Sequence, residues 1–193
     1  SSAASDVYKR QVTPEQVVVS LAPGITISNI TERLGGNVRV VRAMPNTPAM
    51  LGEGMTGVSY GEASYTEEEK ETIRDIFSSC GRVELVEERL MDAVGCVSGS
   101  SPAFVYMFIE ALADGGVKYG LPRKTAYAMA AQTVLGSAKM ILETGKHPGQ
   151  LKDEVCSPGG TTIAGVSALE EHGLRNALIK AADACYEKTQ SMK

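Results

Sequence analysis

The segment Cys156–Gly173, with the sequence CSPGGTTIAGVSALEEHG, contains residues well suited to binding an anion. Its Pro-Gly-Gly run at 158–160 predicts a tight turn directly before a helix, which places Thr161 and Thr162 in the first helical turn. Backbone N–H groups there lack partners within the helix and lie at the positive end of its dipole. Hydroxyls beside such groups favour a carboxylate ligand. A threonine cap on an ordinary helix explains the same residues, and the sequence leaves both interpretations open.

A second polar stretch, AMPNTPAM at Ala43–Met50, follows an apolar run that predicts a strand. In open α/β sheets, ligands bind beyond the carboxyl ends of parallel strands. Asn46 offers both a donor and an acceptor in a frame made rigid by two prolines. A turn bracketed by prolines, without a ligand, fits equally well.

A third stretch, VSGSSPAF at Val97–Phe104, is small and polar and precedes a long apolar segment. Such residues are typical of a helix cap and also of a loop beside a ligand. The spacing does not distinguish these roles.

The stretch GEGMTG at Gly52–Gly57 has the G-x-G-x-x-G spacing of a dinucleotide-binding turn. A true fingerprint joins a buried strand to a helix and has an acidic residue about 20 positions further on. Here Pro45 and Pro48 precede the glycines, and prolines are excluded from central strands. The apolar VSYG that follows is typical of a strand, and Phe77 stands where the acidic residue belongs. We therefore predict a loop that leads into a strand.

Other catalytic and metal-binding patterns are not evident in the sequence. We find no Ser/His/Asp or Cys/His arrangement, and the carboxylates at 67–69 and 87–88 are typical of solvated faces. The cysteines lack C-x-x-C spacing, and the chain has only two histidines. We expect no metal site and no disulfide framework, but free thiols in a reducing cytoplasm. The cysteines are Cys80, Cys96, Cys156 and Cys185.

The length and composition indicate one folded domain or two small ones. The chain has 193 residues, of which 43% are hydrophobic, and this content suffices for a core. A net charge of −4 and the lack of a basic run argue against nucleic acid or an anionic membrane as partner. No apolar run approaches the ~20 residues of a membrane span.

Alternating strands and helices are expected over the first half of the chain. The continuous apolar runs at 17–24 and 38–45 predict strands of a parallel sheet buried on both faces, and shorter strands are expected at 56–61 and 82–88. Between the first two, the residues at 25–36 have the spacing of an amphipathic helix that ends at Gly35. This order is typical of part of a doubly wound α/β sheet.

The helix expected from Thr66 to Gly81 opens with a capping box, because Glu69 follows Thr66 by three residues. Its buried stripe is expected to comprise Ile73, Ile76, Phe77 and Cys80.

Beyond about Asp92 the pattern becomes helical. Residues 103–112 are apolar nearly all round, as in a helix buried in a bundle or a subunit interface. Further helices are expected from Pro122 to Gly145, from about Thr162 to His172, and from Leu174 onward. We expect an α/β domain at 12–94 and an all-α domain at 95–193, preceded by a disordered or non-native leader at 1–11.

The segments VVRAMPNTP, AVGCVSGSSPAFVYMFIEALADGGVKYGLPR and HPGQLKDEVCSPGGTTIAGVSALE together closely resemble the Δ1-pyrroline-5-carboxylate reductase family of proline biosynthesis. The resemblance extends from about Val17 to the C-terminus. It implies a Rossmann-like dinucleotide-binding domain, a helical dimerisation domain, NADPH or NADH as cofactor, and a homodimer or a ring of dimers. The family's own G-x-G-x-x-G precedes the region matched here, so we expect an N-terminally truncated form.

The resemblance also implies roles for individual residues. Ala22, in the turn SLAPG, matches a loop that contacts the cofactor, and Asn46 lies on the nicotinamide side. Four residues match the loop that holds the substrate carboxylate through backbone amides, namely Ser157, Gly160, Thr161 and Thr162. The Thr162 hydroxyl falls near the ring nitrogen and is the expected catalytic group. Ser101 departs from the family pattern, which has glycine there.

Two alternatives remain open from the sequence. One is another dehydrogenase with a helical second domain, although such enzymes generally depend on a catalytic lysine and none stands in these motifs. The other is a non-catalytic dimerisation fragment. For the reductase, a protonated imine is electrophilic enough that orientation is the main task of the protein.

Overall fold

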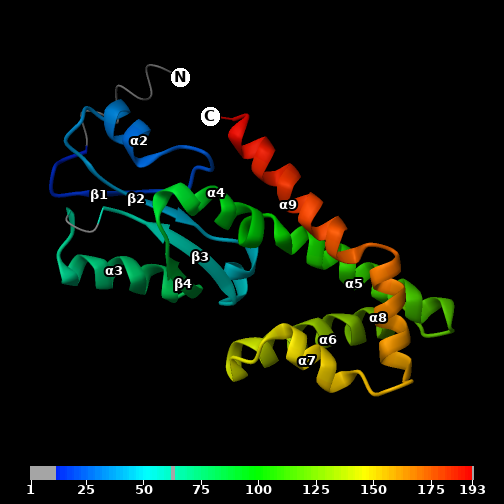
Figure 1. The fold of residues 1–193 in the computed structure, drawn as a ribbon. Coiled ribbons are helices and arrows are strands. Elements are labelled where there is room, and N and C mark those ends of the chain that lie inside the picture. Colours follow the sequence, from blue (N-terminus) through cyan, green and yellow to red (C-terminus); the bar gives the residue numbers. More distant parts are fainter. Residues whose placement is uncertain (1–11, 62–63, 193) are drawn as a thin grey trace. The chain divides into compact units, whose positions relative to one another are not determined.

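The computed structural model describes residues 12–61 and 64–192, so the expected leader at 1–11 lies outside the described residues (Figure 1). Contacts divide this chain into two compact units. One unit extends to Pro102 and includes the segment that begins at Ala182, and the other is Ala103–Ala181. The domain boundary expected at 94/95 remains a prediction.

The first unit contains a four-stranded mixed sheet in the order β1-β2-β3-β4. Its strands are β1 (Val17–Ser20), β2 (Arg39–Met44), β3 (Gly54–Ser59) and β4 (Gly81–Leu85). β1 is parallel to β2, β2 is antiparallel to β3, and β3 is parallel to β4.

The connections explain these directions. Helix α2 (Ile27–Arg33) joins β1 to β2 and helix α3 (Glu67–Ser78) joins β3 to β4, so both crossovers give parallel pairs. Between β2 and β3 there is only a short connection with the 3₁₀ helix η1 (Thr47–Leu51). A parallel crossover needs a dozen or more residues, so β3 returns antiparallel. Figure 1 shows α2 and α3 on opposite faces of the sheet.

Local capping fixes where both helices begin. The Thr26 side chain accepts a hydrogen bond from the Asn29 N–H at the start of α2. The capping box of α3 is confirmed, because Thr66 and Glu69 each accept from the other's backbone N–H, at 3.2 and 2.9 Å.

The core of the α/β unit is a cluster of side chains from β2, β3 and α3, joined by Tyr65. Ile73 is buried as expected, and Phe77 packs against the cluster. The prediction was wrong for two other stripe residues. Ile76 is 55% exposed because it lies about 60° round the helix from Ile73, and Cys80 is exposed because α3 ends before it.

β1 is less buried than expected. Its residues are only partly covered, and Val19 is 40% exposed, so the expectation of burial on both faces was wrong for this strand. Val41 of β2, by contrast, is fully buried.

The glycines of GEGMTG serve backbone packing. Gly52 closes η1 in the left-handed region at φ 75°. Gly54 opens β3, earlier than the strand expected from 56, and a Cβ there would lie 2.8 Å from the Cys80 carbonyl oxygen. At Gly57 a Cβ would lie 2.6 Å from a Val94 methyl group. The stretch leads into a strand, as expected, but only Gly52 and Glu53 lie in the loop, and residues 54–57 already belong to β3.

One long helix begins in the first unit. The elements η3 (Glu88–Leu90), α4 (Met91–Val94), the π-helical turn η4 (Gly95–Gly99) and α5 (Ser101–Lys118) follow one another. By length and composition alone, the 31-residue stretch Glu88–Lys118 could cross a membrane, contrary to the expectation from the sequence. Core helices of soluble proteins meet the same criteria.

The second unit is helical. After α5 come α6 (Arg123–Thr144), α7 (Pro148–Val155), α8 (Thr161–Glu171) and α9 (Leu174–Gln190). Helix α7 was not expected from the sequence. Three small residues form the buried cluster of this unit, and they permit close helix packing: Ala113, Ala126 and Ala130.

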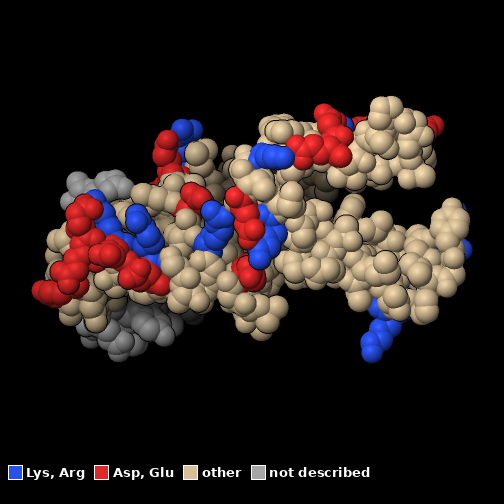
Figure 2. Space-filling model, turned by 90° about the horizontal axis from the view of Figure 1, so that it is seen from below, with Lys and Arg blue, Asp and Glu red and all other residues tan. Residues whose placement is uncertain are grey.

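Charged side chains of both signs are interspersed on the face shown in Figure 2, and no large basic area is visible there. This distribution agrees with the nearly balanced net charge of −4.

Candidate functional site

The turn before α8 has the geometry expected from its sequence. The Gly160 N–H donates to the Ser157 carbonyl at 3.0 Å, and Gly159 has a φ of 67°. Proline followed by a glycine with positive φ is typical of a type II turn. Gly160 is the N-cap of α8 and no side chain caps this helix, so the threonine-cap interpretation is wrong.

The first turn of α8 therefore presents free backbone N–H groups. The first intrahelical bond runs from the Ala164 N–H to the Gly160 carbonyl, at 3.4 Å, so Thr161, Thr162 and Ile163 have no intrahelical acceptor. Thr161 and Thr162 are exposed, and within the described part of the chain neither hydroxyl has a hydrogen-bond partner. This arrangement suits a carboxylate.

Gly160 has a steric role in this turn. A Cβ at this position would lie 2.4 Å from the Ser157 Oγ, so a side chain would displace the serine hydroxyl. The turn therefore favours glycine at 159 for its conformation, while glycine at 160 leaves room for the Ser157 hydroxyl in its present position.

The histidines are engaged elsewhere. His147 caps α7 by accepting the Gly149 N–H at 3.1 Å, and His172 Nδ1 lies 2.9 Å from the Ala168 carbonyl. Neither ring is engaged with the turn at 157–162, so the site's polar groups are N–H groups and hydroxyls.

In the first unit, a pocket of about 190 Å³ lies beyond the carboxyl ends of β1 and β2. Pro23, next to Ala22, lines it together with Met44 and Pro45, which precede Asn46. The structure thus brings the two loops expected to bind the cofactor to one pocket. The other lining residues are Asp92, Gly95, Gly99, Ser100 and Thr189.

The Ala22 loop is exposed. The Ala22 N–H donates to the Ser20 hydroxyl at 3.3 Å, which tightens the turn after β1. The side chain is a methyl group, so its own contact with a ligand would be apolar.

The Asn46 side chain is occupied at both ends. Its Nδ2 donates to the Ser98 carbonyl at 3.1 Å, and its Oδ1 accepts the Met55 N–H at 2.9 Å. Its contact with the cofactor stays a prediction.

The SGSSP segment is helical and does not act as a cap. Ser98 and Ser101 donate back to the carbonyls of Val94 and Cys96, at 3.0 and 2.9 Å. The departure from glycine at Ser101 is thus accommodated by a local bond. Gly99 and Ser100 of this segment line the pocket beside Met44.

The cysteines are free thiols, as expected. Cys96 is buried in the π-helical turn and donates to the Asp92 carbonyl at 3.2 Å. Burial raises the pKa of its thiol, which favours the protonated form.

A buried charge cluster was missed by sequence reasoning. The Arg42 side chain, 4% exposed, lies 3.3 Å from Glu88 and 3.8 Å from Asp92. Glu88 also accepts the Ile27 N–H at 2.6 Å. An arginine inside the apolar run VRVVRAM was the available signal, because a buried arginine requires acidic partners.

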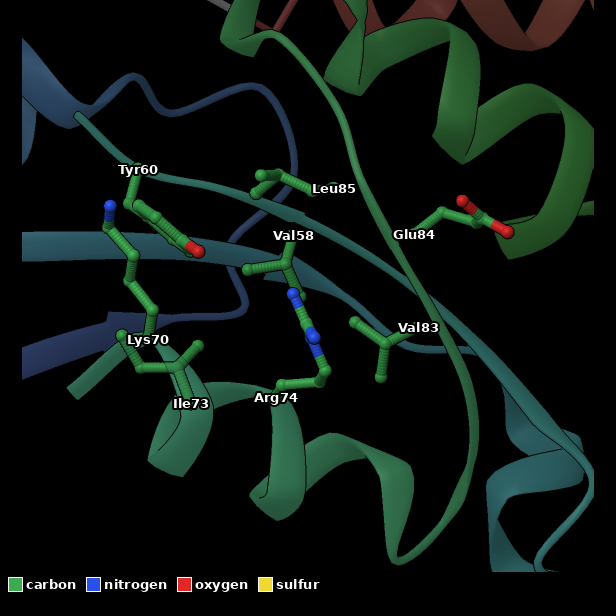
Figure 3. Close-up of a pocket in the computed structure, with 8 residues that line it drawn as sticks. All are labelled: Val58, Tyr60, Lys70, Ile73, Arg74, Val83, Glu84 and Leu85. Atoms are coloured by element: carbon green, nitrogen blue, oxygen red, sulfur yellow. The ribbon is translucent and has the colours of Figure 1, made fainter. Parts of the chain in front are cut away.

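The predicted site residues fall into the two units. Ala22 and Asn46 belong to the first, and Ser157, Gly160, Thr161 and Thr162 belong to the second. Among the described residues, no group of three His, Cys, Asp or Glu could hold a metal ion. Figure 3 shows a separate cavity of about 420 Å³ in the first unit, where Lys70 and Arg74 of α3 lie opposite strand residues, and it contains none of the predicted residues.

An α/β unit with a pocket at its strand ends, followed by a helical unit with an open helix N-terminus, defines a class of two-part α/β-plus-α proteins. The family profile described as "Pyrroline-5-carboxylate reductase dimerisation" matches residues 88–192, more than half of the chain. The chain belongs to the pyrroline-5-carboxylate reductase family.

Individual relatives agree with this assignment. The pyrroline-5-carboxylate reductase of Escherichia coli is 51% identical over 178 residues, which are 92% of this chain and 66% of that protein. The Glycine max reductase is 47% identical over 94% of this chain. This chain spans about two thirds of the length of such relatives, 66% and 65% for these two.

A solved structure of the Plasmodium falciparum pyrroline carboxylate reductase with NADP bound is similar at a TM-score of 0.87 and 34% identity. The similarity covers 98% of this chain and 77% of that one. The expected fold class, a Rossmann-like α/β part followed by a helical domain, is confirmed.

Proposed function

We propose that the protein containing this chain reduces Δ1-pyrroline-5-carboxylate to L-proline with a hydride from NAD(P)H, the last step of proline biosynthesis. The observation that carries the proposal is the uncapped N-terminus of α8 behind the Ser157–Gly160 turn, in a chain of the reductase family.

The substrate carboxylate is held by the first turn of α8. Its oxygens accept from backbone N–H groups at Thr161 and Thr162, where the helix dipole also favours negative charge. Hydrogen bonds to a charged group contribute about 1.5–3 kcal/mol each. Ser157 and Gly160 shape this turn.

The Thr162 hydroxyl lies near the ring nitrogen of the bound imine. Since a protonated cyclic imine is already electrophilic, the protein mainly orients it. This agrees with a turn whose polar groups are hydroxyls and backbone amides, with both histidines engaged elsewhere.

The residues at the strand ends fit the nicotinamide part of the cofactor. The 190 Å³ pocket is lined mainly by Pro23, Met44, Pro45 and two glycines, which suits a flat ring. Ala22 and Asn46 flank it. NAD(P)H, when bound, supplies the hydride. The Plasmodium falciparum relative, solved with NADP, supports this choice of cofactor.

A homodimer is part of the proposal. The helical unit buries only small side chains among its described residues, and three alanines are too few for an independent core. Large apolar side chains of α5 and α6 stay exposed, including Tyr106 at 59%, Met107 at 68% and Leu135 at 55%. A second copy covers such a surface. A larger assembly of dimers and a cytoplasmic location also belong to the proposal.

The deciding experiment follows NADPH oxidation by the full-length protein with pyrroline-5-carboxylate as substrate. An open-chain 2-oxo acid serves as the control substrate, because a dehydrogenase acting on hydroxy acids would turn it over in the reverse direction. We expect turnover with the imine alone. Turnover of the oxo acid alone would overturn the proposal.

The 193-residue chain itself provides a second test. We expect it to elute as a dimer in size-exclusion chromatography and to bind NADPH poorly, because GEGMTG is not a pyrophosphate-binding turn. A monomer would contradict the proposed dimer, and micromolar affinity for NADPH would contradict the expectation of weak binding.

A further inference from the structure

The Ser98 carbonyl cannot accept the hydrogen bond that an α-helix would provide. In an α-helix this oxygen would accept from the N–H of residue 102, and residue 102 is a proline without an N–H group. The backbone around it is the π-helical turn η4, in which the Ser100 N–H bonds to the Gly95 carbonyl at 2.8 Å.

Asn46 supplies a side-chain donor to this oxygen. Its Nδ2 lies 3.1 Å from the Ser98 oxygen, while its Oδ1 accepts the Met55 N–H at 2.9 Å. The amide therefore joins the loop after β2 to η4 on one side and to the start of β3 on the other. All of these residues belong to the first unit.

This connection sets the shape of the pocket at the strand ends. Met44 and Pro45 form one wall, and Gly95, Gly99 and Ser100 form another. The Met44 side chain already lies close to both glycines, since Cβ atoms placed on them would be 3.8 and 3.9 Å from its atoms. A loop released from η4 would change the width of this pocket.

We propose that Asn46 is a positioning residue for cofactor binding, acting through the Ser98 carbonyl and not by contact with the cofactor. This inference rests on the proposed function. Each polar atom of its amide bonds to the backbone of a different segment, so the side chain joins the loop after β2 to η4 and to the start of β3.

A double-mutant cycle tests this role, because Pro102→Ala restores an N–H that can serve Ser98. In the full-length protein, we expect Asn46→Ala to raise KM for NADPH about ten-fold, with kcat changed less than about three-fold. Pro102→Ala alone should change KM less than about two-fold. In the double variant, KM for NADPH should be at least about three-fold lower than in Asn46→Ala alone.

Asn46→Asp is the second variant, in case Asn46→Ala fails to fold. It keeps an acceptor for Met55, replaces the donor by a carboxylate oxygen and adds a negative charge, so its rise in KM should be at least as large, and Pro102→Ala should still relieve part of it. Independent, multiplicative effects of the two substitutions would overturn the role of Asn46.

A failure of the proposed function is distinguishable from a failure of this inference. A wild-type protein without activity on pyrroline-5-carboxylate would overturn the proposed function. The same four proteins are then compared by melting temperature. We expect the effects of substitutions at 46 and 102 on the melting temperature to be coupled. Additive effects would overturn the structural basis of the inference.

Discussion

Gln190 donates a 2.9 Å hydrogen bond to the buried carboxylate of Asp92, across 98 residues of sequence. Asp92 also faces Arg42 of β2, with 3.8 Å between the nearest nitrogen and oxygen. The end of α9, the start of the long helix and the central sheet therefore meet at one carboxylate.

Asp92→Ala should destabilise the first unit by about 2–4 kcal/mol. Breaking a buried pair costs about 3–5 kcal/mol because a charge is left uncompensated, and Glu88 at 3.3 Å from Arg42 reduces this loss. Gln190→Ala should cost only about 1 kcal/mol, for one hydrogen bond. Urea unfolding measures both.

Glu87→Ala is the matched control for that pair of variants. Glu87 is paired with Arg89 on the surface, where both side chains are mostly exposed, so its loss should leave the free energy of unfolding nearly unchanged. Equal effects of Asp92→Ala and Glu87→Ala would show that the cluster does not stabilise the fold.

Glu69 should make stability depend on acid pH. Its hydrogen bond from the Thr66 backbone N–H, and then the Arg39 guanidinium, hold the pKa of its carboxyl below its usual value. A lowered folded pKa gives stability that is present above the unfolded value and lost as pH falls through the folded one. The difference in melting temperature between wild type and Glu69→Gln should therefore begin to narrow below about pH 4 and shrink further as the pH falls.

Glu68→Gln controls for the helix dipole, because Glu68 shares the first turn of α3 but makes no capping bond. At neutral pH, Glu68→Gln should change the melting temperature less than Glu69→Gln does. If the gap between wild type and Glu69→Gln stayed constant from pH 7 to 3, the capping carboxylate would not be the cause.

Tyr65→Phe should leave stability unchanged or raise it by up to about 1 kcal/mol. The Tyr65 ring is 8% exposed and packs edge-on against Tyr60, with centroids 5.1 Å apart, while its hydroxyl has no partner among the described residues. A buried hydroxyl without a hydrogen-bond partner destabilises the folded state, so its removal should not lower the free energy of unfolding. A loss above 1 kcal/mol in thermal unfolding would reveal a bond to that hydroxyl.

The features predictable from sequence are those fixed by near neighbours in the chain. The capping box of Thr66 and Glu69 and the turn before Thr161 depend on residues within four positions, so the pattern was sufficient. Helix α7 was not predicted because it is short and its N-cap is His147, an unusual cap residue.

The features that were missed depend on tertiary contacts. The short connection between β2 and β3 explains why β3 is antiparallel to β2. The start of β3 at Gly54, before the apolar residues that predicted the strand, was missed. Pro102 has no N–H group, so the sequence shows that the Ser98 carbonyl cannot have an α-helical donor. Only the fold identifies Asn46 as a side-chain donor to it.

Gly159→Ala should weaken substrate binding in the full-length protein. At φ 67°, a Cβ strains the turn by about 1–2 kcal/mol, which would shift the N–H groups at the start of α8 and raise KM for the imine several-fold. Gly159→Asn should be milder, because asparagine tolerates this conformation. Equal KM values for both variants and wild type would contradict a role for the turn's shape.

Thr162→Ala should lower kcat/KM for pyrroline-5-carboxylate by roughly ten- to a hundred-fold, through loss of a hydrogen bond to a charged group worth about 1.5–3 kcal/mol. Ser167→Ala is the matched control, because its hydroxyl on the same helix only bonds back to the Ile163 carbonyl at 2.9 Å. KM for NADPH should stay unchanged in both variants, since Thr162 belongs to the substrate turn. Wild-type turnover by Thr162→Ala would refute the role of this hydroxyl, while an equal loss in Ser167→Ala would point to damage to α8 as a whole.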